Sequence, residues 1–222
     1  MIAFDSFAES DASGNTGGTL LFSFNNVGGT FLLCACCDDN SVDPGILGFY
    51  GGDQLTELFN GLLGAAHLWV GYLVNPKTGA NNLSLNKTGT MAAFRTGVIT
   101  FTGVDANNPL GGNNNASESS NTNNFLGTTV TVQGTSGLIV DAFMGSRVTA
   151  GNAKTPQTEK MNNTGLWGGA VDHLAGMSIE AHTGSNITMT WENFTGQSGA
   201  TKKIIYATEL LPSTFTPKIQ II

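Results

Sequence analysis

The feature that most constrains this chain is a repeated alternation of apolar and polar residues in short segments. In residues 19–24, Leu20, Phe22 and Phe24 occupy every second position, so they share one face of an extended strand. Successive side chains of a strand point to opposite faces, and this spacing is therefore typical of a strand with one buried face. The same pattern recurs in three further segments, at residues 128–132, 177–182 and 187–191.

Continuous apolar runs predict a second kind of strand, which lies at the centre of a sheet and is buried on both faces. These runs cover residues 31–37, 67–74, 98–104, 138–144 and 204–211. Turn-forming Gly, Asn and Pro separate the strands, at residues 25–29, 43–45, 75–79 and 133–137. About ten short strands joined by such turns predict an all-β fold, a two-sheet antiparallel jelly roll or β-sandwich with at most one short helix.

Three segments do not follow the strand pattern. In residues 53–63 the apolar positions have helical spacing, with Asp53 as a cap and Gly64 as a stop, which predicts a short helix. The alternative is a strand over 52–59 followed by a loop, and both stay open. Residues 111–124 are almost entirely polar and are expected to form a long solvated loop, and residues 145–173 a second irregular region.

Length and composition fit one large domain. The chain has 222 residues, of which 40% are apolar. All-β sandwiches of about 200–250 residues occur as single domains, and no linker-like break interrupts this chain. We therefore expect one jelly-roll domain over residues 1–212 and a C-terminal arm over residues 213–222.

The charge of the chain argues against two classes of partner. Charged residues make up 11% of the chain, with 9 Lys+Arg and a net charge of −7. Binding to nucleic acid or to an anionic membrane surface needs clustered basic residues, so neither partner is expected. Residues 1–6 contain Asp5 where a signal peptide would be basic, and no apolar run reaches the roughly 18 residues of a membrane span. We expect synthesis in a cytoplasm without a signal peptide.

The order of several segments resembles a known family. Residues 51–56 (GGDQLT), 73–76 (LVNP), 101–105 (FTGVD), 137–141 (GLIVD) and 187–191 (ITMTW) follow one another as in the jelly-roll, concanavalin A-like domains of bacteriophage virion proteins and bacterial surface proteins. The resemblance spans residues 2–212, and its most specific part is the FTGVD run. It implies a structural or adhesive module without catalytic residues, and it favours a strand over residues 52–58.

The three cysteines lie together, at Cys34, Cys36 and Cys37. Neighbouring residues on opposite faces of a strand are poorly placed for a disulfide, and a metal site would need a second cluster of ligands. We interpret them as small apolar residues of a buried strand.

The candidates for catalysis are isolated acids. A glycosidase needs two facing carboxylates, but Glu180 and Glu192 are each alone in their strands. Asp141 is expected to face solvent or to bond a turn, and His182 to lie on the surface. No Gly-x-Ser-x-Gly motif is present, and the histidines are not at metal-ligand spacing: His67, His173 and His182. We expect no enzymatic activity, no catalytic residue and no metal site.

The sequence contains candidate residues for binding calcium and for binding a glycan. Residues 38–40 and 105–108 place several oxygen ligands in short segments, as calcium requires. Both segments are also ordinary Asx-rich turns. We therefore predict no cofactor, with calcium as the alternative. Trp167 lies in a glycine-rich segment and is the candidate for binding a glycan. Trp69 and Trp191 lie in predicted strands and are expected in the core.

The C-terminal arm is too apolar for a free tail. It either completes the sheet of its own domain or adds a strand to a neighbouring subunit, with four candidate contact residues: Phe215, Ile219, Ile221 and Ile222. From these features we expect a non-enzymatic structural protein of a virion, such as a bacteriophage capsid decoration or accessory head or tail protein. Its partners would be other virion proteins and further copies of itself. The alternative is a lectin-like adhesin of a tail fibre or cell surface that binds a host surface glycan.

Overall fold

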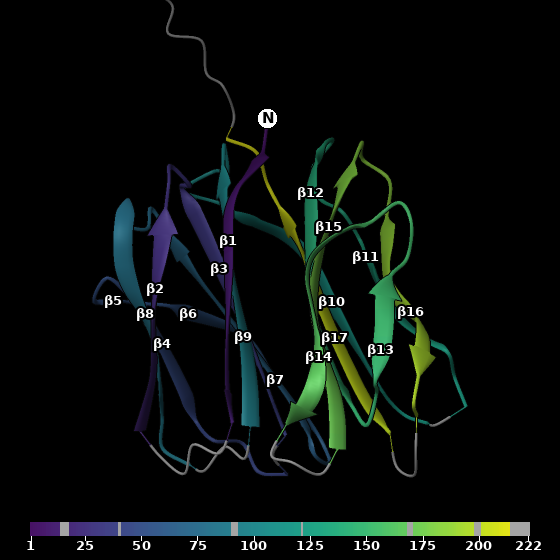
Figure 1. The fold of residues 1–222 in the computed structure, drawn as a ribbon. Helices are drawn as coiled ribbons and strands as arrows, with labels where there is room; N and C mark the ends of the chain where they lie inside the picture. Colours follow the sequence, from purple (N-terminus) through teal and green to yellow (C-terminus); the bar gives the residue numbers. More distant parts are fainter. Residues whose placement is uncertain are drawn as a thin grey trace, which may run out of the picture.

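The fold is antiparallel β throughout the part of the chain that the structure describes (Figure 1). This is a computed structural model, and it describes residues 1–13, 18–39, 41–89, 93–120, 122–167, 171–197 and 201–213. These residues contain strands and turns but no helix, and their strands form four sheets. The predicted all-β sandwich is confirmed, but with two pairs of sheets in place of the single expected pair.

The N-terminal half contributes one inner and one outer sheet. The N-terminal inner sheet has the order β1 (Ala3–Ser13), β9 (Ala93–Thr102), β3 (Phe31–Asp39), β7 (Ala66–Val74) and β6 (Thr56–Leu63). The N-terminal outer sheet has the order β2 (Gly18–Asn26), β8 (Gly79–Lys87), β4 (Ile46–Tyr50) and β5 (Asp53–Gln54).

The C-terminal half contributes a second pair. The C-terminal inner sheet has the order β10 (Leu110–Ser119), β17 (Lys202–Leu210), β12 (Gly137–Ser146), β15 (Val171–His182) and β14 (Thr158–Trp167). The C-terminal outer sheet has the order β11 (Phe125–Val130), β16 (Ile187–Thr195) and β13 (Ala150–Ala153).

The two halves repeat one strand order. In each inner sheet the first strand of the half pairs with its last strand, which then pairs with its third: β1-β9-β3 in one half and β10-β17-β12 in the other. In each outer sheet the second strand pairs with the last but one, and then with the fourth: β2-β8-β4 and β11-β16-β13. Strands that cross between two sheets in this way give a jelly roll, so the chain contains two of them in tandem.

The inner sheets of the two halves pack face to face, and their contacts are reciprocal. Strand β3 lies across β12. Strand β9 contacts β15, and the equivalent pair is β17 with β7. Strand β1 contacts β14, and the equivalent pair is β10 with β6. Each of these contacts has its counterpart with the two halves exchanged, which approaches the pattern of a two-fold related interface, although the contact of β7 with β12 is not matched by an equally extensive contact of β3 with β15. The four sheets therefore form a stack, outer–inner–inner–outer, which is seen edge-on in Figure 1.

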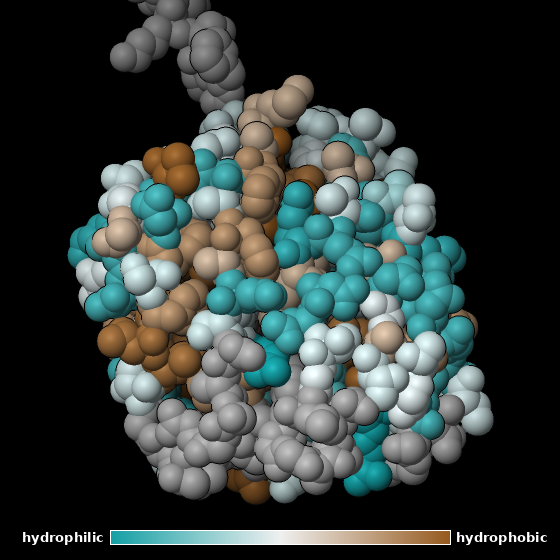
Figure 2. All heavy atoms as spheres, in the orientation of Figure 1, coloured by the Kyte–Doolittle hydropathy of each residue, from teal (hydrophilic) through white to brown (hydrophobic). Residues whose placement is uncertain are grey.

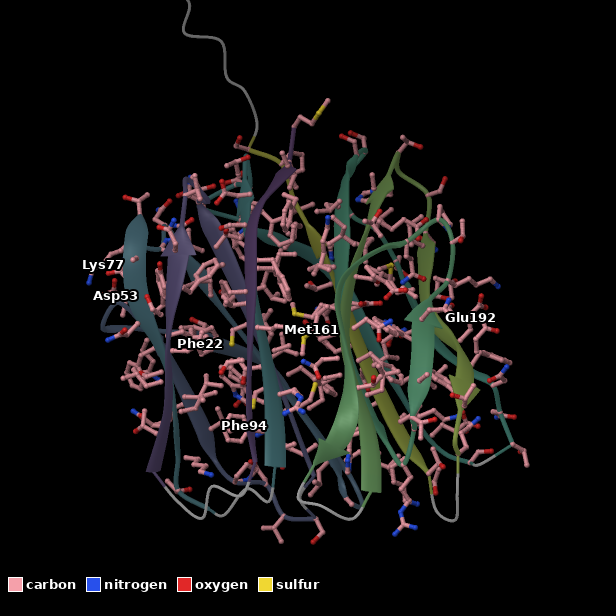
Figure 3. The ribbon with its side chains drawn as sticks, viewed as in Figure 1. Phe22, Asp53, Lys77, Phe94, Met161 and Glu192 are labelled. Atoms are coloured by element: carbon pink, nitrogen blue, oxygen red, sulfur yellow. The ribbon has the colours of Figure 1, made fainter. Side chains whose placement is uncertain are left out.

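Three hydrophobic clusters fill the three gaps of this stack. The central cluster includes Leu33 of β3, Val140 of β12 and Met161 of β14, and it joins the two halves. The other two clusters lie between each inner sheet and its outer sheet. Figure 3 shows Phe22 and Phe94 in the N-terminal gap, and Met161 at the centre of the molecule. The prediction of one domain over residues 1–212 stays a prediction, which the shared central cluster favours.

All five continuous apolar runs are strands of the inner sheets, which confirms their prediction as central strands. An inner sheet is covered on both faces, so both sets of its alternating side chains must be apolar. Three of the four alternating segments belong to outer sheets, at β2, β11 and β16. These sheets have one face in contact with an inner sheet and one face in solvent, as the alternation predicts.

The predicted helix over residues 53–63 is wrong, because this segment forms β5 and β6. Strand β6 is an edge strand paired with β7, and its register shifts between Glu57 and Phe59. The irregular register places Leu58, Phe59 and Leu63 against the central cluster. A bulged strand thereby mimics helical spacing, since the extra residue breaks the period of two.

The two predicted loop regions also contain strands. Residues 110–119 form β10, an edge strand paired with β17, whose polar side chains are mostly exposed. Residues 145–173 include β13 and β14. Because edge strands bury little apolar surface, their composition resembles that of a loop. No helix in the described ranges is long and apolar enough to cross a membrane.

Candidate functional site

The three histidines are all buried: His67 is hydrogen-bonded to a carboxylate, and His182 lies close to one without hydrogen-bond alignment. His67 Nδ1 lies 2.5 Å from Asp38 Oδ2, and His182 Nε2 lies 3.1 Å from Glu209 Oε1. The predicted surface position of His182 is therefore wrong. A Cβ on Gly137 would lie 2.6 Å from His182 Nε2, so the absence of a side chain at Gly137 leaves room for the imidazole.

The His67 group has the carboxylate–imidazole part of a catalytic triad but not its nucleophile. The second ring nitrogen, Nε2, lies 2.7 Å from Asn60 Oδ1, and the Asn60 amide donates to Asp43 Oδ2 at 2.9 Å. A histidine that activates a nucleophile directs this nitrogen at a hydroxyl or thiol. An amide oxygen occupies that position here, so the group connects β3, β6 and β7 without an evident reaction.

Glu209 is likewise engaged by the backbone. Its carboxylate accepts hydrogen bonds from the amide nitrogens of Gly112 at 3.0 Å, Gln133 at 2.7 Å and Gly134 at 2.9 Å. Each bond satisfies a backbone donor that would otherwise need another partner. Glu209 therefore holds the start of β10 and the segment after β11 against β17.

Asp141 is fully buried, and the expectation that it faces solvent or bonds a turn is wrong. One carboxylate oxygen accepts from the amide nitrogen of Ser178 at 2.7 Å, and the other from Trp191 Nε1 at 3.2 Å and Gln157 Nε2 at 3.3 Å. Burial disfavours the charged form more than these donors favour it, and the pKa of Asp141 is raised to about 7.

The two predicted glycosidase carboxylates are not brought together. Glu180 belongs to β15 of an inner sheet and lines a hollow with Pro156 and Ile179. Glu192 belongs to β16 of an outer sheet and lines a different hollow with Phe125. Burial raises the pKa of Glu180, which is half-exposed. Neither acid has the other as a partner for two-carboxylate chemistry.

The predicted calcium segments are used in other ways. Asp38 is bound to His67, and the side chains of residues 39 and 40 lie outside the described part. Asp105 Oδ1 accepts from the amide nitrogens of Asn107 at 2.8 Å and Asn108 at 3.3 Å, which is an Asx turn. Among the described side chains, no group of three or more Asp, Glu, His or Cys is placed to hold a metal ion.

The remaining candidate residues divide between the core and the uncertain segments. Trp69 and Trp191 are core residues, as predicted, and the three thiols are buried and free on β3, also as predicted. Burial raises the pKa of all three thiols. Trp167 ends β14, but its side chain lies outside the described residues, as do the four predicted contact residues of the arm.

The most distinctive exposed surface is the outer face of strands β2, β8 and β4, here called the uncharged face. Its apolar side chains are Leu21 of β2 and Leu47 and Phe49 of β4, with Leu21 57% and Leu47 49% exposed. Residues across the strands complete it: Leu21 pairs with Ser84, which pairs with Phe49. The other outward residues are Thr19, Ser23, Asn25, Ala80, Asn82 and Asn86.

Among the described residues, no ionisable side chain points outward from the uncharged face, although the chain carries a net charge of −7. Asp53 and Lys77 pair with each other at 3.3 Å and lie at its edge in Figure 3. Figure 2 shows apolar residues in patches over the N-terminal half, whereas hydrophilic residues dominate the C-terminal half. Flat apolar faces without charge are typical of surfaces that contact another protein.

The alternation of Leu20, Phe22 and Phe24 indicates only the buried side of β2, so this face does not follow from it. Leu21 alternates with those residues, and an apolar residue at an outward position is the signal that could have found it. Comparison with known proteins adds no family: no family model matches the chain, and no curated protein matches it.

Proposed function

We propose that this protein is a non-enzymatic structural component of a virus particle, of the class of bacteriophage capsid decoration or accessory head or tail proteins. The observation that carries the proposal is the uncharged face, a flat sheet surface suited to contact with a neighbouring subunit. Further copies of the chain and other virion proteins are the proposed partners, and the particle is the proposed location.

The charge distribution supports docking through this face. Bringing together two copies of an acidic protein costs electrostatic repulsion, which is least where the approaching surfaces carry no charge. Contact would bury Leu21 and Leu47 and remove no charged group from water, so the desolvation cost stays low.

The architecture supports a mechanical role. Two jelly rolls joined through a continuous central cluster form a thick block whose outer faces point in opposite directions. A block of this kind can present one face to a particle and the other to solvent. The buried Asp38–His67 and His182–Glu209 pairs fit the same role, because the first links β3 to β7 and the second links β15 to β17.

Incorporation into particles tests the proposal directly. Leu21→Lys and Leu47→Lys each place a charge on the uncharged face, and both side chains point into solvent, so the fold should be retained. The matched control is Leu62→Lys on β6, which is 44% exposed but lies outside this face. Tagged variants are expressed during infection, and purified particles are probed by immunoblot.

The expected result is that wild type and Leu62→Lys co-purify with particles, whereas Leu21→Lys and Leu47→Lys are depleted. Absence of the wild-type protein from purified particles would contradict the proposed location. Equal incorporation of all variants would leave the protein in the particle but refute docking through the uncharged face.

A further inference from the structure

The opposite end of the stack carries a groove of a different character. It lies on the outer face of the C-terminal outer sheet and has a volume of about 430 Å³. Its wall is Phe125 of β11, which pairs directly with Glu192 of β16. Figure 3 shows Glu192 at the outer margin of the molecule, on the side away from the inner sheets.

Phe125 is the most exposed aromatic side chain of the described residues, at 61%. Its strand neighbour Leu126 points inward to the hydrophobic cluster, so Phe125 is the side chain directed at solvent. An isolated phenyl ring on an otherwise polar sheet face has no packing role in the fold. It provides a flat apolar platform beside the groove.

Gly127 accommodates one of the residues that line the groove. It lies on the same face as Phe125, two residues further along β11, and it pairs with Thr190. A Cβ at this position would lie 2.7 Å from Thr190 Oγ1 and 3.0 Å from the carbonyl oxygen of Met189. The missing side chain leaves room for the Thr190 side chain, which lines the groove.

Polar groups of several kinds line the groove. Residues Asn124, Lys154, Thr188, Thr190, Glu192 and Asn193 line the groove with Phe125. The side-chain nitrogen Nδ2 of Asn193 donates to Asn152 Oδ1 at 3.1 Å, so the side-chain oxygen Oδ1 of Asn193 can accept a hydrogen bond from a ligand. Within the described residues, no hydrogen bond or ion pair engages the Glu192 carboxylate.

We propose that this groove binds a pyranose saccharide. A pyranose has one face of C–H bonds, which packs on an aromatic ring, and a rim of hydroxyl groups, which need both donors and acceptors. The groove supplies the ring, a carboxylate, hydroxyls, amides and one ammonium group at short range. Ligand sites combine an apolar wall with a few placed polar groups in this way.

The charge of the site favours an uncharged sugar. Lys154 and Glu192 balance each other within the groove, while the whole chain carries −7. An acidic polysaccharide or a nucleic acid would be repelled by that net charge and would find a single basic residue. The ligand class is therefore a neutral or N-acetylated pyranose oligosaccharide, presented on a surface that the protein meets.

An array of neutral, N-acetylated and acidic oligosaccharides tests the inference on the whole protein. Wild type should bind neutral or N-acetylated members, and Phe125→Ala and Glu192→Gln should each weaken binding of the best member by about tenfold or more. The matched control, Leu62→Ala, removes an exposed apolar side chain of β6, outside both the groove and the uncharged face, and should bind as wild type does. Circular dichroism checks that each variant is folded.

Two results would overturn the inference. The first is a wild-type protein that binds no neutral or N-acetylated member of the array. The second is binding that survives both Phe125→Ala and Glu192→Gln, particularly if Trp167→Ala abolishes it, because the sugar would then bind elsewhere. The array uses purified protein, so its outcome is independent of whether the protein is incorporated into particles.

Discussion

The buried carboxyl of Asp141 should make the stability of the protein depend on pH in a defined direction. Its pKa is about 7 in the folded chain, against 3.8 for an unperturbed aspartate. The unfolded chain therefore releases this proton near pH 4, whereas the folded chain retains it until near pH 7. Between these values the folded state binds more protons, so the free energy of unfolding falls as pH rises.

The size of the effect follows from the difference in pKa. A difference of about 3, at about 1.4 kcal/mol for each pH unit, amounts to ~4 kcal/mol. This contribution is fully present below pH 4, decreases between pH 4 and pH 7, and is lost above pH 7. This contribution is a large fraction of the total stability of a domain, which is typically about 5–15 kcal/mol.

Asp141→Asn isolates this contribution, because asparagine does not titrate. Exchanging the hydrogen-bonding groups shifts the stability of the variant by an amount that does not change with pH. The difference, wild type minus variant, should therefore fall by ~4 kcal/mol from pH 4 to pH 8. Urea unfolding followed by tryptophan fluorescence at each pH gives both curves.

Asp53→Asn is the matched control, since Asp53 is an exposed acid, with 51% of its side chain accessible, paired with Lys77 at the surface. Its stability curve should run parallel to that of wild type between pH 5 and pH 8. If the Asp141→Asn curve also runs parallel to wild type, Asp141 does not change protonation in this range, and the assigned balance between burial and hydrogen bonding is wrong.

Three further predictions concern packing. Gly176→Ala would place a Cβ 2.1 Å from the indole ring of Trp191 and should cost about 1–3 kcal/mol or more. A Cβ on Gly28 would meet only Asp5 Oδ1, at an ordinary contact distance of 3.8 Å, so Gly28→Ala should change stability by about 0.5 kcal/mol or less; thermal unfolding compares the two. The three buried thiols should react with a thiol reagent only after denaturation, and rapid reaction of the native protein would contradict their burial. Because the central cluster joins both halves, calorimetric and van't Hoff enthalpies of unfolding should agree, and two separate transitions would show independent domains.

The sequence was sufficient to predict the inner strands, because burial on both faces leaves a continuous apolar run. Residues 31–37 and 138–144 are central for this reason, and they became β3 and β12. The edge strands were not predictable in the same way. Strand β10 exposes most of its side chains, and the bulge in β6 replaces the period of two with an apparent helical period.

The tandem arrangement has no visible repeat in the sequence, because the two halves fill their cores from different strands. Trp69, on β7, belongs to an inner sheet, whereas Trp191, on β16, belongs to an outer sheet. Each indole lies in the gap within its own half, but on a different sheet of that half. Only the pairing of strands shows that the second half repeats the first.

The candidate sites depended on contacts between distant residues, and the sequence predicted them least well. His182 is buried because Gly137, on another strand, leaves room for it, and no local pattern indicates this. Phe125 was accessible to sequence reasoning, since it alternates with the inward residues Leu126 and Val130. The groove beside it was not, because its lining residues come from three segments that are distant in the sequence.

The measurement that tests the central proposal most directly is immunogold electron microscopy of virus particles from the source of the chain, with antibody against the purified protein. The account predicts label on the particles, either spread over the head or confined to the tail. Label on the cell surface or in the cytoplasm, with particles unlabelled, would contradict a structural role in a virion.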